Sequence, residues 1–328
     1  SAYPLIRDDL AGTTASGLFE AKLGREHFGK EVHVFSPAYT QEDFTQLLEL
    51  CDHIVFNSFG QWKKYRQQVQ DATRNISCGI RINPGYAEVE TDLYNPCISG
   101  SRMGVPLEQM EDDFAGLDGI HFHTMCEQNS DVLERTLDHM LPQFDKWLKR
   151  CKWVNFGGGH HITRPDYDVE RLVRCIERVR DTYGVQVYLE PGEAVALNAG
   201  YLVATVLDVV HNGMDIAILD ASAACHMPDV LEMPYRPHIL YSGTAGEKAY
   251  TYRLAGNTCL AGDVIGDYSF DHQLQAGEKL VFCDMAIYSM VKNNTFNGVP
   301  LPDIALYQNG HIDLVKRFGY ADFEGRLS

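Results

Sequence analysis

The sequence predicts an α/β fold, a (β/α)8 TIM-like barrel without its first strand, followed by a C-terminal, mainly antiparallel β domain. Up to about residue 195, short β-branched and aromatic segments alternate with amphipathic helical segments, as in parallel βαβ units. Beyond that point, apolar and polar residues alternate between Gly and Asp turns, which is typical of antiparallel strands. The 328 residues are 45% hydrophobic, enough for one large core and a smaller one. We therefore expect a barrel at 1–195 and a β domain at 196–328.

Seven strands are expected in the barrel, one fewer than a complete barrel has. Each is a short apolar run bounded by polar or turn residues. The helices between them show apolar residues three and four positions apart, at 41–50, 130–151 and 167–183. The expected barrel strands are Gly17–Glu20, Val32–Phe35, His53–Asn57, Cys78–Asn83, Gly119–His123, Trp153–Phe156 and Val185–Glu190. Those of the β domain are Tyr201–Val210, Met214–Leu219, Tyr250–Leu254 and Lys279–Cys283.

Composition and charge exclude several classes of protein. The formal net charge of −17 and the lack of a basic stripe argue against a nucleic-acid partner. An acidic chain suits a cationic ligand, although acidity also simply keeps proteins in solution. No apolar run approaches the roughly 18 residues that cross a bilayer, and the nine cysteines include no CxxC pair. We expect a soluble, cytoplasmic protein with reduced thiols and no membrane partner.

Two neighbouring strands of the predicted barrel end in residues suited to a phosphorylated cofactor. Gly157, Gly158 and Gly159 follow one strand, and freed backbone amides at such a place can cradle a phosphate. The next strand ends in Glu190-Pro191-Gly192-Glu193, at the face where barrel enzymes keep their sites. An acidic side chain there can hold a protonated ring nitrogen. A tight βα turn and a capping acid are the structural alternatives.

Histidines suggest a rival interpretation. His121 and His123 lie two residues apart on one predicted strand, so they share a face of the sheet. Together with His160 and His161 they could bind zinc. No clear carboxylate ligand accompanies them at other strand ends, however, and strand histidines are usually hydrogen-bonded core residues. We therefore predict no metal site.

In the β domain, a glycine-bounded loop carries a thiol and a carboxylate. Cys259 and Asp263 lie four residues apart between Gly256 and Asp267. A thiol can donate a proton to a carbanion, and a carboxylate can hold an ammonium group, although most lone cysteines are buried and inert. Tyr288, followed by the turn at 295–298, could complete an anion cradle or be a core tyrosine.

In this order, the motifs resemble those of the fold type III pyridoxal phosphate (PLP) decarboxylases, the alanine racemase-like barrels that act on ornithine, arginine and diaminopimelate. The resemblance covers the whole sequence and is most specific at 12–30, 119–127, 156–163, 189–194 and 256–267. It implies PLP as cofactor and a cationic, polyamine-like amino acid as substrate, carboxynorspermidine or carboxyspermidine, at the end of a route to norspermidine or spermidine. It also implies a homodimer with shared active sites.

The resemblance further implies a role for each site residue. His123 would stack on the cofactor ring, Glu190 would pair with the pyridine nitrogen, and Cys259 would donate a proton from the partner subunit. Besides His123 and Glu190, the implied cofactor-binding residues are Gly157, Gly158, Gly159, Gly192 and Tyr288. The implied substrate-binding residues are Glu193, Asp229, Glu232 and Asp263.

Two departures from the family pattern bear on the substrate. Glu193 stands where the wider family usually has Arg, so a cofactor contact is replaced by a group suited to a cationic substrate. Leu260 stands where ornithine enzymes often have Asp, which makes ornithine a less favoured substrate. Asp229 and Glu232 are the acidic candidates for the far end of a longer polyamine.

The Schiff-base lysine of this family lies on the first barrel strand, and no lysine of this sequence matches it. Lys22 and Lys30 belong to later segments. We therefore expect the sequence to begin just after that lysine, in keeping with the missing first strand. Two alternatives stay open at this point: a decarboxylase of diaminopimelate, ornithine or arginine, and a non-catalytic regulatory homologue that lacks the lysine.

Overall fold

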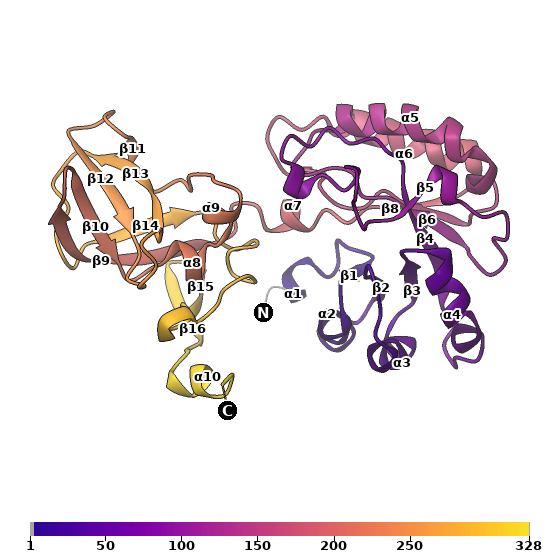
Figure 1. Cartoon of the computed structure of the whole chain (residues 1–328), viewed down its shortest axis with the longest axis horizontal. Helices are drawn as coiled ribbons and strands as arrows, with labels where there is room; N and C mark the ends of the chain where they lie inside the picture. The colour runs from indigo at the N-terminus through magenta and orange to yellow at the C-terminus, as the bar shows by residue number, and fades with distance from the viewer. Residues whose placement is uncertain (1–2, 328) are drawn as a thin grey trace. The chain divides into compact units, whose positions relative to one another are not determined.

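The computed structural model describes residues 3–327 and divides the chain into two compact units, Ser1–Val195 and Ala196–Ser328. In the first unit, seven parallel strands form one sheet in the order β1-β2-β3-β4-β6-β7-β8, and short β5 pairs with β4 (Figure 1). Their bounds are β1 Gly12–Ala15, β2 Glu31–Phe35, β3 His53–Phe56, β4 Ser77–Asn83, β5 Val105–Pro106, β6 Gly119–His121, β7 Trp153–Asn155 and β8 Gln186–Tyr188. The predicted TIM-like α/β fold is confirmed.

Helices connect successive strands and lie on the outer side of the curved sheet (Figure 1). Three of these helices begin after a side-chain N-cap. Thr40, Ser58 and Asp168 each accept a hydrogen bond from the backbone amide three residues later. The helices are α1 Tyr3–Ile6, α2 Leu18–Leu23 with the π-helix η1 Gly24–Phe28, α3 Gln41–Leu50, α4 Phe59–Gln70, α5 Ser130–Leu148, α6 Val169–Tyr183 and α7 Gly192–Ala196; η2 Asp92–Tyr94 and η3 Leu107–Gln109 are single 3-10 turns.

One predicted strand is wrong. Gly17–Glu20, expected to be a strand, contains the start of helix α2, and the strand lies earlier, at Gly12–Ala15. Two consecutive threonines favour an extended backbone at the earlier position. The later segment buries Leu18 and Ala21, three residues apart, on one helical face.

The two faces of the parallel sheet have different chemistry. Ile54, Ile80, Ile120 and Val154 are completely buried and belong to the main apolar core. The opposite, inner face of strands β2 to β7 carries several buried polar groups, namely His33, His53, Arg81, His121 and Asn155. Register places Arg81, His121 and Asn155 side by side on β4, β6 and β7. A row of polar side chains therefore lines the inside of the sheet.

The second unit is a mixed, mainly antiparallel sheet with the strand order β11-β13-β12-β10-β9-β14, in which only β10 and β12 are parallel among the described residues. Strands β15 and β16 form a separate antiparallel hairpin. The elements are β9 Tyr201–His211, β10 Asp215–Leu219, α8 Ala223–His226, α9 Asp229–Glu232, β11 Gly243–Thr244, β12 Tyr250–Ala255, β13 Val264–Phe270, β14 Lys279–Cys283, η4 Phe296–Gly298, β15 Ile304–Gln308, β16 His311–Lys316 and α10 Tyr320–Glu324. The predicted β domain is confirmed, although β11, β13, β15 and β16 were not predicted. Across residues 3–327, no helix combines the length and apolarity that a membrane span requires.

The indole ring of Trp153 packs directly on two glycines at the inner face of the sheet. Gly79, Gly119 and Trp153 are register neighbours on β4, β6 and β7. A Cβ at Gly119 would lie 2.1 Å from the Trp153 ring, and a Cβ at Gly79 would lie 2.3 Å from it. Both positions therefore need glycine because the indole occupies the space of a side chain.

We predict that Gly119→Ala lowers the free energy of unfolding by about 1–3 kcal/mol, because the added methyl group overlaps the indole. Urea denaturation checks this. The matched control is Gly60→Ala in helix α4, where the nearest atom to an added Cβ is 3.7 Å away; it should be neutral or stabilising by up to about 1 kcal/mol. Equal effects of the two substitutions would contradict the packing argument.

Candidate active site

The predicted site residues of the first unit meet at the carboxyl ends of β6, β7 and β8. The amide of Glu190 donates a 2.8 Å hydrogen bond to the carbonyl oxygen of Gly157. A Cβ at Gly158 would lie only 2.7 Å from the carbonyl oxygen of Glu190. The two strand ends that the sequence singled out are thus in direct contact, at the edge of a parallel sheet where binding sites form.

Glu190 is held by two side chains from neighbouring strands. Asn155 donates from Nδ2 to Oε1 at 2.8 Å, and Nε2 of His121 lies 3.2 Å from Oε2. Burial by itself would raise the pKa of Glu190, but the charge and hydrogen bond of His121 and the hydrogen bond of Asn155 outweigh it and lower the pKa to about 2. The carboxylate therefore stays ionised and fixed in orientation.

His123 has its tautomer set by the backbone. Its Nδ1 accepts a 3.0 Å hydrogen bond from the amide of Gly158. Burial, reinforced by the positive charges of Arg81 and His121, lowers the pKa of His123 to about 3. A neutral ring whose Nδ1 accepts must carry its proton on Nε2. Arg81 also donates a hydrogen bond to the backbone carbonyl oxygen of His123 at 3.3 Å, so both the ring and the backbone of His123 are held by hydrogen bonds.

The glycine run has the conformation that the sequence indicated. Gly157 and Gly159 have φ of 70° and 81°, where other residues are strained. The amide of Gly157 donates to Asn155 Oδ1 at 2.8 Å, and the amide of Gly158 donates to His123. Within the described chain the Gly159 amide has no such partner. A phosphate that used all three predicted amides would have to replace two side-chain acceptors, so Gly159 is the amide best placed for it.

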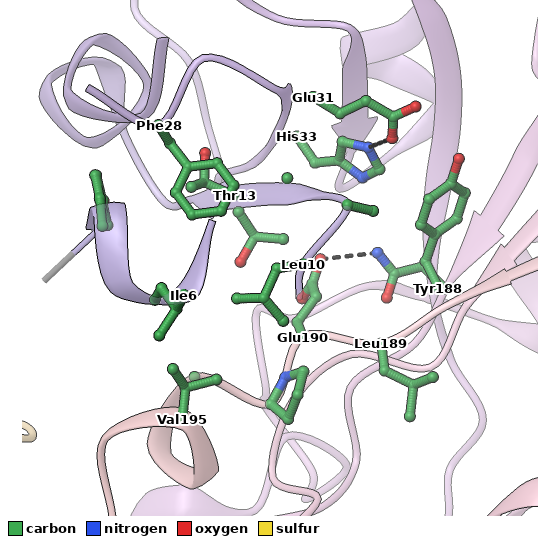
Figure 2. A pocket seen from close by; sticks show the side chains of 17 residues that line it. Ile6, Leu10, Thr13, Phe28, Glu31, His33, Tyr188, Leu189, Glu190 and Val195 are labelled. Atoms are coloured by element: carbon green, nitrogen blue, oxygen red, sulfur yellow. Dashed lines mark hydrogen bonds and ion pairs between the residues drawn. The ribbon is translucent and has the colours of Figure 1, made fainter. Parts of the chain in front are cut away.

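A cavity of about 260 Å³ lies between β1 and the end of β8 (Figure 2). Asn155, Glu190 and Gly192 supply polar groups from one side, and Glu31 and His33 supply them from the other. The remaining wall is mainly apolar and is built by Ile6, Leu10, Phe28, Leu189 and Val195, among others. A complete barrel has an eighth strand between β8 and β1, so this cavity lies at the open seam of the sheet, and the charged end of Glu190 borders it.

The histidines do not form the zinc site that served as the rival interpretation. His160 lies 1% exposed, with Nε2 near the carbonyl oxygen of Phe156. Both ring nitrogens of His161 are buried and have no hydrogen-bond partner in the part of the chain that the structure describes. None of His121, His123, His160 and His161 belongs to a group of metal-ligand atoms among residues 3–327.

The Cys259 loop lies in the second unit and is anchored by Asp263. This carboxylate is 3% exposed and accepts from the hydroxyls of Ser222 and Thr258, at 2.8 and 2.6 Å, and from the amide of Ala224. Asp263 therefore holds the loop, and its predicted contact with the substrate stays a prediction. Cys259 itself is exposed.

The Phe-Asn-Gly turn supports the same loop. Asn297, which has φ of 56°, accepts a 2.8 Å hydrogen bond at Oδ1 from the amide of Cys259. The turn thus orients the thiol-bearing residue, a coupling that the sequence did not reveal. Tyr288 is 53% exposed, and the ammonium of Lys292 lies 5.5 Å from its ring centroid.

Asp229 and Glu232, predicted to bind the far end of a polyamine, already share a cation. Nζ of Lys292 lies 2.5 Å from Asp229 Oδ1 and 3.4 Å from Glu232 Oε2. The two acids are one helical turn apart on α9 and point the same way. They therefore form a position that accepts a primary ammonium group. Glu193, the other predicted acid, lies partly buried on α7 of the first unit.

Several known proteins resemble this chain over most of its length. A sequence-family model described as "Pyridoxal-dependent decarboxylase, C-terminal sheet domain" matches residues 33–286. A carboxynorspermidine/carboxyspermidine decarboxylase of Campylobacter jejuni is 43% identical over 99% of this chain and 87% of its own length. A carboxyaminopropylagmatine decarboxylase of Synechocystis is also 43% identical, over 99% of this chain and 84% of its own length. The crystal structure of carboxynorspermidine decarboxylase from Campylobacter jejuni, complexed with norspermidine, superposes with a TM-score of 0.90 at 41% identity, covering 99% of this chain and 88% of that one.

We predict that Glu190→Gln destabilises the protein by about 2–3 kcal/mol at neutral pH and by progressively less in acid. The pKa of Glu190 lies below its ordinary value of 4.5, at about 2, so its stabilising effect is present above about pH 5 and is lost as the pH falls toward 2. Urea unfolding of both proteins at about pH 7, 4 and 3 measures the difference. The exposed Glu49→Gln is the control, and a difference for Glu190→Gln that does not change with pH would refute the assignment.

Proposed function

This chain belongs to the pyridoxal-dependent decarboxylases, and from that premise we propose that it decarboxylates carboxynorspermidine or carboxyspermidine to norspermidine or spermidine. The observation that carries the proposal is the buried, ionised Glu190 beside a neutral His123 and a glycine-lined strand end. The alternatives of diaminopimelate, ornithine and arginine fit less well, because the relatives at 43% identity act by name on larger, polyamine-derived substrates.

The residues present fit PLP. A side chain at Gly158 or Gly159 would collide with backbone, since a Cβ at Gly159 would lie 2.0 Å from the carbonyl oxygen of Met125. Close packing against backbone therefore requires glycine at both positions. We propose the amide of Gly159 as the main phosphate contact, with Gly192 and the Tyr288 hydroxyl as the further contacts that the family resemblance implies. Glu190 would hold the pyridine nitrogen, and His123 would stack on the ring.

When bound, PLP supplies an electron sink for the pair left on Cα as carbon dioxide departs. Glu190 would keep the proton on the pyridine nitrogen, because a carboxylate with so low a pKa attracts a cation and does not take the proton itself. His123, neutral and fixed through Nδ1, would limit the tilt of the ring. Arg81 would position His123 by donating a hydrogen bond to the backbone carbonyl oxygen of His123.

Cys259 is the proposed proton donor to Cα. Its thiol is exposed, on a loop that Asp263 and Asn297 hold in place. We propose that it acts in a homodimer, in which one subunit completes the site of the other.

The acidic pair that binds Lys292 bears on which of the two kinds of substrate this chain accepts. A carboxyaminopropylagmatine substrate ends in a guanidinium, which prefers a planar, bidentate partner, whereas a norspermidine or spermidine precursor ends in an ammonium, a compact point charge. Asp229 and Glu232 hold the ammonium of Lys292 at 2.5 and 3.4 Å. We infer that this pair selects the terminal ammonium of the substrate, with Lys292 as an internal competitor, and that carboxynorspermidine or carboxyspermidine is therefore preferred.

We predict that the full-length, PLP-loaded enzyme has a kcat/KM at least about tenfold higher for carboxynorspermidine or carboxyspermidine than for carboxyaminopropylagmatine, corresponding to about 1.4 kcal/mol. Chromatography of the amine products measures this. A preference for the guanidino substrate, or for diaminopimelate, would overturn the proposal.

The same assay with Lys292→Met should show a lower KM for the ammonium substrates, because the internal competitor is gone. Lys248→Met is a matched control, since Lys248 pairs with Asp271 elsewhere in the second unit. An unchanged KM in Lys292→Met would show that Lys292 does not compete with the substrate. It would not contradict the proposed decarboxylation.

We predict that Cys259→Ala lowers kcat by about 10²- to 10⁴-fold, as expected for loss of a positioned proton donor, while the PLP absorbance is retained. Aldehyde by-products should rise because the carbanion is reprotonated at the wrong atom. Cys283→Ala, at a half-buried thiol of β14, is the control. Unchanged turnover in Cys259→Ala would exclude this role.

A further inference from the structure

Three potential metal ligands meet on the inner face of the parallel sheet. His33 on β2 and His53 on β3 are direct register partners, and Glu31 lies two residues before His33 on the same face. One ligand atom from each residue lies within 4.8 Å of the other two. The sequence did not predict a metal here, since the pairing of His33 with His53 depends on strand register. None of the three has a role in the proposed decarboxylation.

The donor atoms are in a suitable state to bind a cation. His33 is 7% exposed, and an imidazole binds a metal through a ring nitrogen that carries no proton. Nε2 of His33 lies 3.0 Å from Oε2 of Glu31, as Figure 2 shows. Nδ1 of His53 is buried and has no hydrogen-bond partner among residues 3–327, and the whole residue is 9% exposed.

Packing alone accounts for only part of this arrangement. The rings of His33 and His53 are stacked, with centroids 3.9 Å apart, and Tyr188 and Trp153 pack around them. Phenylalanine rings would stack equally well without burying polar nitrogen atoms. The unsatisfied nitrogen of His53 is a cost that a bound cation would remove.

We propose that Glu31, His33 and His53 bind one divalent transition-metal ion of the zinc class. Two imidazoles and one carboxylate are a common ligand set for zinc, with a water in the fourth position. Tyr188 packs edge-on against His33 from β8, with ring centroids 4.9 Å apart, and so helps to fix the orientation of this imidazole.

Binding requires a small rearrangement. The two imidazoles lie within 5° of parallel, whereas ligand lone pairs must converge on one point, so the rings must turn apart. The side chain of Glu31 is 43% exposed, which gives an ion a route of entry.

The test is titration of the PLP-loaded, full-length protein, stripped with a chelator, with Zn²⁺ by calorimetry and with Co²⁺ by visible absorption. We expect one equivalent in the wild type and cobalt bands typical of nitrogen ligands. His53→Gln and His33→Gln should each weaken binding at least about 100-fold, because each removes one of three ligands. His311→Gln, at an exposed histidine of β16, should leave the affinity unchanged.

Glu31→Gln keeps the shape of the side chain and is the second test, in case the histidine variants do not fold. It should also weaken Zn²⁺ binding, with the thermal midpoint of the metal-free protein unchanged. Absence of binding to the wild type, or binding that survives His53→Gln and Glu31→Gln alike, overturns the proposal. Because the readout is metal affinity, neither result depends on whether the protein decarboxylates a polyamine precursor.

Discussion

The buried carboxylate of Glu190 is the interaction on which the site depends. A lone carboxylate in a protein interior would take up a proton, because burial disfavours its charge. Here His121 and Asn155 come from the two preceding strands and supply one hydrogen bond to each oxygen. The parallel order β6-β7-β8 is therefore what keeps the charge in place. The same order brings His123 and the glycine run next to Glu190.

Asn155 links the electrostatics of the site to its backbone. Its Nδ2 donates to Glu190, and its Oδ1 accepts from the amide of Gly157. One side chain thus fixes both the acidic group and the start of the glycine turn. The amide of the next residue, Gly158, fixes His123 in the same way. These hydrogen bonds fix the relative positions of three strand ends. The backbone between them passes so close to its neighbours that an added Cβ at any of Gly157, Gly158 and Gly159 would collide with them.

The sequence predicted the features that short-range patterns encode. Alternating strand and helix segments gave the fold class, and glycines or acids after strands located Gly157–Gly159 and Glu190. It failed where the outcome depends on neighbours far away in the chain. Gly17–Glu20 was wrong because its burial follows a helical face, and the partners of Glu190 and the burial of Asp263 depend on which segments pack together. The contact between His33 and His53 likewise follows from the register of β2 and β3.

The charge pattern of the inner face follows one physical rule. Glu190 is the ionised acid and Arg81, 4% exposed beneath the ring of Phe35, is the cation, although burial lowers its pKa to about 10. His123 stays neutral, because burial disfavours its charged form and the positive charge of Arg81 adds to this effect. A group that enters with a positively charged ring nitrogen is attracted by Glu190 and meets no competing proton on His123. The interior is thus electrostatically prepared for a protonated heterocycle before the ligand arrives, so little reorganisation is needed on binding.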